Sequence, residues 1–123
     1  MEAFQSGSRK NVEHIFRRLG FLYSYIGTNF LIDAVLLCYR EPDALTAVTK
    51  RVYPEIAKRD GTKWRNVERN MRTALEAFWD RGNRAFLNEM AGYELRVRPS
   101  VGEIINYIVG YLLDQEKSEA QRS

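Results

Sequence analysis

Residues that carry catalysis or bind metal ions are scarce in this sequence of 123 residues. It holds one cysteine, Cys38, which excludes an internal disulfide, and one histidine, His14, with no motif between the two. A metal site or a nucleophile–base pair needs several such groups at set spacings. The acidic residues show no paired spacing either. We therefore expect no enzymatic activity, no metal ion and no cofactor, and we expect Cys38, in an apolar run, to be buried.

Long hydrophobic runs are also missing. No apolar stretch approaches the roughly 18 residues that cross a bilayer, and the polar N-terminus lacks the apolar segment of a signal peptide. A single cysteine is typical of a reducing compartment. We therefore expect a cytoplasmic protein with no membrane partner. Its length fits one domain, and 45% hydrophobic with 28% charged residues predicts a folded globule.

Basic residues are concentrated in one part of the chain. The formal net charge is +3. Residues 50–84 hold ten Lys or Arg against five Asp or Glu, whereas the remainder holds nine against eleven. A mild net charge says little, but this uneven distribution favours an anionic partner for residues 50–84.

Apolar residues recur at helical spacing along most of the chain. The pattern predicts helices over residues 11–19 with Asn11 as N-cap, 28–39, 45–59 and 62–82, then a short helix ending at 91–92. Pro54 should bend or split the third helix. A last helix should follow the capping box formed by Ser100 and Glu103. We expect an all-α single domain of about six helices over residues 11–114, between a disordered tail (1–10) and a flexible one (115–123).

The middle of the chain has the order helix, short turn, longer helix that is typical of a helix-turn-helix. Asp60-Gly61 is a strong turn signal, and Thr62 is the expected N-cap of the longer helix. At about 100° per residue, apolar side chains gather on one side of that helix, namely Val67, Met71, Ala74, Leu75 and Phe78.

The opposite side of the longer helix carries charged side chains, with Arg65, Glu68, Arg69 and Arg72 within an arc of roughly 100°. Arginine forks match the two acceptors of a guanine edge, and a carboxylate accepts from a cytosine amino group. We therefore predict that the helix lies in the major groove of double-stranded DNA, with Glu68, Arg69 and Arg72 on the bases. Candidates for contacts with the DNA backbone are Lys50, Arg51, Lys58, Thr62, Lys63, Arg65, Arg81 and Arg84.

The same residues resemble a known family, the C-terminal DNA-binding effector domains of stage zero sporulation protein A. The similarity extends over about residues 12–113. The matching pieces are Tyr53-Pro54-Glu55-Ile56-Ala57-Lys58, Val67-Glu68-Arg69, Arg72, Ala74 with Glu76, Trp79 with Arg81-Gly82-Asn83, and Gly92-Tyr93. The resemblance implies a six-helix transcription regulator whose fourth helix reads a short box of the TGTCGAA type. It assigns base contacts to Glu68, Arg69 and Arg72.

The resemblance also implies partners. In that family the stretch after the fourth helix touches the RNA polymerase sigma factor, and here it falls on residues 83–92, with Phe86, Leu87 and Met90. We expect the free domain to be monomeric and to pair only on tandem DNA boxes.

The chain departs from the family pattern in three places. Asn66 stands where an arginine is common, and Thr73 stands where a histidine is common, so contacts with flanking bases should differ. The family's phospho-receiver domain has no counterpart here, so the chain is either an excised effector domain or a stand-alone relative. The alternative function is an interaction module of the same fold that does not read DNA and modulates a regulator or RNA polymerase.

Overall fold

The structure is a computed structural model that describes residues 5–122. Six α-helices and two short irregular helical turns follow one another, and no strand occurs in this part of the chain. The elements are α1 (Arg9–Leu19), α2 (Ile26–Arg40), η1 (Pro42–Thr46), η2 (Val48–Val52), α3 (Tyr53–Asp60), α4 (Trp64–Arg81), α5 (Arg84–Ala91) and α6 (Val101–Arg122). The predicted all-α single domain of about six helices is confirmed.

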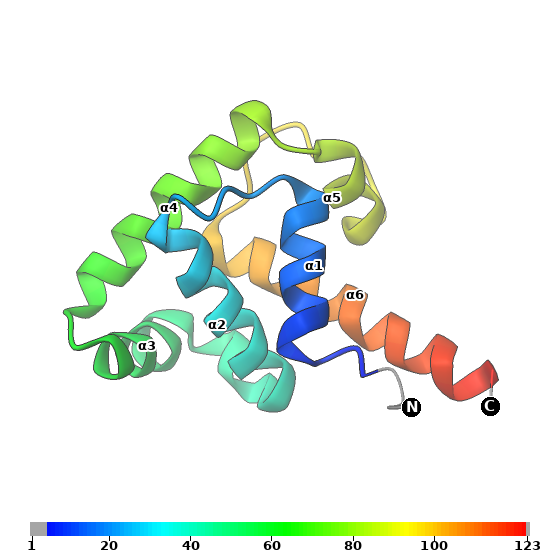
Figure 1. The fold of residues 1–123 in the computed structure, drawn as a ribbon, viewed down its shortest axis with the longest axis horizontal. Helices are drawn as coiled ribbons and strands as arrows, with labels where there is room; N and C mark the ends of the chain where they lie inside the picture. Colours follow the sequence, from blue (N-terminus) through cyan, green and yellow to red (C-terminus); the bar gives the residue numbers. More distant parts are fainter. Residues whose placement is uncertain (1–4, 123) are drawn as a thin grey trace.

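Helix α2 lies at the centre of the fold, between α1, α4 and α6 (Figure 1). Nine of its 15 residues are buried, so it is apolar on nearly every side, as expected of a helix surrounded by others. Cys38 is fully buried there, and this burial raises the pKa of its thiol to about 11. The thiol is therefore protonated at neutral pH, which agrees with a structural rather than a reactive cysteine.

Helices α2 and α4 approach each other closely at Gly27. A methyl group added at Gly27 would collide with the backbone carbonyl of Asn70 in α4. Only glycine leaves room for this approach, so the N-terminal end of α2 rests directly on the backbone of α4.

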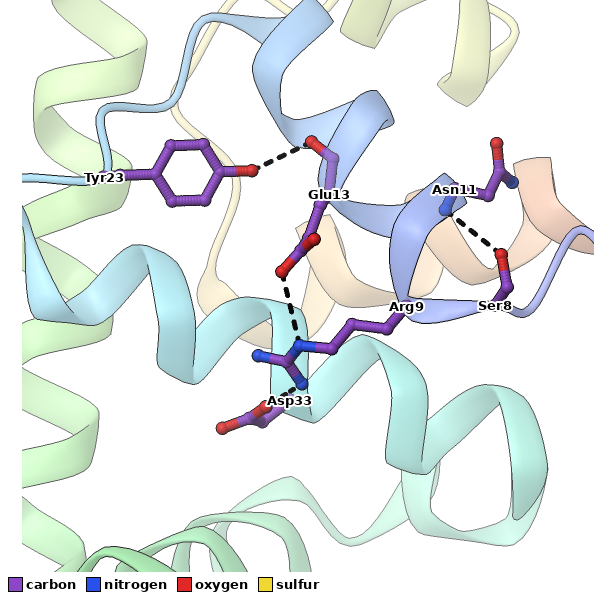
Figure 2. Close-up of polar contacts among 6 residues, drawn as sticks. All are labelled: Ser8, Arg9, Asn11, Glu13, Tyr23 and Asp33. Carbon is purple, nitrogen blue, oxygen red and sulfur yellow. Dashed lines mark hydrogen bonds and ion pairs between the residues drawn. The ribbon is translucent and has the colours of Figure 1, made fainter.

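Helix α1 is held on α2 by polar contacts at its surface (Figure 2). Arg9 bridges two carboxylates, Glu13 on α1 at 3.3 Å and Asp33 on α2 at 2.8 Å. The Tyr23 hydroxyl donates to the backbone carbonyl of Glu13 at 3.0 Å. These contacts orient α1, while the buried side of the helix supplies the apolar packing.

The first helix begins earlier than the sequence predicts. Helix α1 begins at Arg9 and is capped by Ser8, whose Oγ accepts from the Asn11 backbone N–H at 3.1 Å, so Asn11 is not the cap. Ser6 is buried, and its hydroxyl lies 3.0 Å from the Tyr39 hydroxyl. These contacts with α1 and α2 order residues 5–10, whereas residues 1–4 lie outside the described part of the chain.

The polar C-terminal segment is helical through Arg122, whereas the sequence predicts a flexible tail from residue 115. Two side-chain contacts hold its first turn. The Asn11 amide donates to Gln115 Oε1 at 2.9 Å, and the Tyr39 hydroxyl donates to Glu116 Oε2 at 2.6 Å. A hydropathy pattern shows neither contact, because their partners lie about 80 to 100 residues away in the sequence.

The predicted helix over residues 45–59 is divided into η1, η2 and α3. Pro54 is the second residue of α3, where its missing N–H costs no helical hydrogen bond. The helical backbone passes directly from η2 into α3 before Pro54, and the break in the predicted helix lies at Ala47 instead. The capping box is also confirmed, since Ser100 N–H donates to Glu103 Oε1 at 2.9 Å and Glu103 N–H donates to Ser100 Oγ at 3.1 Å.

No helix within residues 5–122 combines the length and the apolar character needed to span a membrane.

Replacing Gly27 with alanine should lower the free energy of unfolding by about 2 kcal/mol or more, because its methyl group overlaps the α4 backbone. Gly110→Ala in α6 is the matched control, since no atom lies within 4 Å of a methyl group there. It should be stabilising by about 0.5–1 kcal/mol. Urea denaturation measures both, and equal effects of the two substitutions would contradict the described α2–α4 crossing.

Candidate nucleic-acid interface

Helices α3 and α4 are joined by a three-residue turn. Gly61, with φ of +69°, takes the left-handed conformation that ends α3, and the Thr62 N–H donates to the Ala57 carbonyl at 2.9 Å. The rings of Tyr53 and Trp64 then stack in parallel, with centroids 6.4 Å apart. The turn and this stacking fix the angle between the two helices, which completes the predicted helix-turn-helix.

The start of α4 differs from the prediction. Lys63, not Thr62, is the N-cap residue, and no side chain caps the helix. The Thr62 hydroxyl instead accepts from the Asn66 amide at 3.0 Å. The first turn holds no acidic side chain, so the positive end of the helix dipole is left uncompensated there.

One side of α4 is part of the hydrophobic core, as predicted. Each of its five apolar residues is at most 2% exposed: Val67, Met71, Ala74, Leu75 and Phe78. The Phe78 ring also stacks on Phe21, with centroids 4.7 Å apart. Because this side is fully packed, the rotation of α4 about its own axis is fixed.

The opposite side of α4, which we call the outer face, consists of Arg65, Glu68, Arg69 and Arg72. The three arginines are exposed, and Glu68 is half-buried. Arg69 donates to Asn66 Oδ1 at 3.0 Å, and Arg72 donates to Glu68 Oε1 at 3.0 Å. Both contacts are made within α4 itself, so the guanidinium groups are not drawn beneath another element.

The ion pair between Glu68 and Arg72 joins adjacent turns of an exposed surface. Their side chains are 33% and 51% exposed. Such an i, i+4 pair contributes roughly 0.3–0.5 kcal/mol. This is less than the roughly 1–3 kcal/mol of discrimination that a bidentate contact with a base provides. The pair therefore orients Arg72 without preventing a contact with DNA.

The arginines of the outer face all lie in the N-terminal half of α4. Further along the same side lie the exposed acidic residues Glu76 and Asp80. Arg98, from the segment between α5 and α6, pairs with Glu76 at 3.7 Å. The sequence gives no sign that Arg98 lies beside α4, because Arg98 and Glu76 are 22 residues apart along the chain.

The predicted backbone contacts fall into two groups. Lys50, Lys58, Lys63 and Arg65 are exposed on η2, α3 and the start of α4. The remaining candidates either lie at the far end of α4 or already have a partner within the protein. Arg51 pairs with Glu41 at 2.6 Å, and Arg84 donates to the Trp79 carbonyl at 2.7 Å.

Distance along the helix separates the second group from the outer face. Helix α4 has 18 residues, so its two ends lie about 25 Å apart. Arg81 is its last residue, and Arg84 begins α5. The structure therefore does not bring Arg81 and Arg84 together with the outer face.

The surface contact suggested for α5 is corrected. Phe86 is 3% exposed and Leu87 is fully buried, because both belong to the core beneath α5, and Met90 is packed against that core. Phe86 and Leu87 cannot touch a partner in this fold. In the part of the chain that the structure describes, no cluster of three or more His, Cys, Asp or Glu residues is suited to a metal ion.

Replacing Glu68 with glutamine should change the free energy of unfolding by no more than about 0.5 kcal/mol, because the pair with Arg72 is exposed. Thermal or urea denaturation measures this. A loss of several kcal/mol would instead show that Arg72 is locked into a structural ion pair.

The chain matches the model of a known protein family. The family model described as "Sporulation initiation factor Spo0A C terminal" matches residues 12–112. The match covers most of the chain, which therefore belongs to this family. The family consists of DNA-binding effector domains of a sporulation response regulator and is not a family of enzymes.

Proposed function

We propose that this member of the Spo0A C-terminal family reads a short DNA box by laying the N-terminal half of α4 in the major groove. One observation carries the proposal. The outer face presents Arg65, Arg69 and Arg72 to solvent, while the opposite side of the same helix is at most 2% exposed. In helix-turn-helix proteins the N-terminal residues of the second helix contact base edges.

Three side chains of the outer face are assigned to the bases. Arg69 lies nearly opposite the buried side of α4, and Arg72 lies one turn beyond Glu68. Each arginine has five N–H donors, so Arg72 can keep its contact with Glu68 and still donate to a guanine. Glu68 then accepts from a neighbouring cytosine amino group.

Phosphate contacts are assigned around this centre. Lys63 and Arg65 lie at the N-terminus of α4, where the helix dipole attracts anions. Lys50 and Lys58 are exposed on η2 and α3. The Thr62 hydroxyl, which accepts from Asn66, keeps its own hydrogen for a phosphate. The outermost phosphates are assigned to Arg51, Arg81 and Arg84.

Protein partners form a further part of the proposal. Two copies are expected to pair on tandem boxes, and α5 is the segment that the family resemblance places against the polymerase sigma factor. Phe86 and Leu87 are buried. We therefore assign the contact with the sigma factor to the exposed side of α5, which includes Glu89.

The proposal is tested by measuring affinity for a TGTCGAA-type duplex and for a scrambled duplex at the same salt concentration. The wild-type domain should prefer the box by about tenfold or more, since each bidentate pair is worth roughly 1–3 kcal/mol. Arg69→Ala should reduce this preference. Lys63→Ala, the matched control, should weaken binding to both duplexes equally.

Equal affinity of the wild-type domain for both duplexes would contradict the proposal and favour an interaction module that does not read DNA. If Arg69→Ala and Lys63→Ala behaved alike, the assignment of base and phosphate contacts would be wrong.

A further inference from the structure

A groove of about 450 Å³ lies beside the outer face of α4. We call it the α4–α6 groove, because it runs from α4 to the N-terminus of α6. Its polar lining includes Tyr53, Glu68, Arg72, Arg98 and Ser100. Arg72 belongs both to this groove and to the outer face, so the two are continuous.

Tyr53 is a buried residue of the groove lining. Tyr53 is 6% exposed, and its hydroxyl forms no hydrogen bond within residues 5–122. Burial raises the pKa of Tyr53 to about 12, and nearby Glu68 raises it while Arg72 lowers it. The hydroxyl is therefore protonated at neutral pH and can donate a hydrogen bond. The hydroxyl oxygen is not sealed from solvent, so an acceptor that enters the groove can reach it.

The N-terminus of α6 adds two further donors. Ser100 and Glu103 cap each other, which leaves the N–H groups of Val101 and Gly102 without partners in the described part of the chain. Both residues line the groove. First-turn N–H groups and the helix dipole favour an anion at this place.

Both acidic and basic side chains line the groove. Glu68 lines it but pairs with Arg72, and Arg98 lines it while pairing loosely with Glu76 at 3.7 Å. Glu103 Oε1 is occupied by the Ser100 N–H. Each carboxylate near the groove thus has a partner, whereas the Tyr53 hydroxyl and the two N–H groups have none among the described residues.

From this arrangement we propose that the α4–α6 groove holds one backbone phosphate of the bound duplex, with the Tyr53 hydroxyl, the Arg98 guanidinium and the α6 N-terminus as its donors. The inference rests on the proposed function. The major groove is about 12 Å wide, about as wide as a helix with its side chains. When Arg72 touches a base, a DNA backbone therefore passes directly beside α4, where this groove opens.

Tyr53→Phe tests the site, because it removes the hydroxyl and keeps the ring that stacks on Trp64. We expect affinity for box and scrambled duplexes to fall equally, by about three- to tenfold, with unchanged preference for the box. Arg98→Gln should lower the slope of log K against log salt by about one. Tyr107→Phe is the control, since its hydroxyl contacts Tyr93, and it should bind like the wild type.

A second arm distinguishes the source of the phosphate. Inorganic phosphate is titrated into the free wild-type and Tyr53→Phe domains, and the melting temperature is followed. If Tyr53→Phe abolished a phosphate-dependent stabilisation but left duplex affinity unchanged, the groove would bind a free anion and the inference would be overturned.

Wild-type preference for the box together with unaltered duplex affinity of Tyr53→Phe and Arg98→Gln would also overturn the inference, while the proposed function would stand. A wild-type domain that bound both duplexes equally would contradict the proposed function itself.

Discussion

The burial of one side of α4 is the constraint on which the rest of the structure depends. Val67, Met71 and Phe78 are enclosed by the core, and Gly27 brings the backbone of α2 against the same helix. Together these contacts fix both the position and the rotation of α4. The arginines of the outer face are held outward because turning the helix would expose its apolar side. Each fully buried side chain of this kind is worth roughly 1.5–3 kcal/mol, which far exceeds the contribution of the surface pair between Glu68 and Arg72.

Features set by neighbouring residues could be predicted from the sequence. Helical periodicity identified the buried side of α4, and Ser100 with Glu103 marked the start of α6. Features set by distant partners could not. Ser6 and Glu116 both meet Tyr39, and these contacts order two polar segments that composition alone predicts to be flexible.

The candidate interface shows the same division. The outer face is a property of one helix, so its arginines could be found by counting residues along α4. Which lysines flank that face depends on how η2 and α3 pack, and the α4–α6 groove depends on the approach of Arg98 and the α6 N-terminus. The prediction that Phe86 and Leu87 touch a partner failed for a related reason. A short apolar helix shows the same hydropathy pattern whether its residues pack in the core or bind another protein. In the structure both side chains are buried beneath α5, so they belong to the core.

The central claim, that the outer face of α4 occupies the major groove, is tested most directly by methylation interference on a duplex carrying the box. Dimethyl sulfate modifies guanine at N7, which lies in the major groove, and adenine at N3, which lies in the minor groove. We expect methylated guanines within the box to block binding and methylated adenines to leave it unchanged. Interference from adenine N3 alone, or equal interference at guanines inside and outside the box, would contradict it.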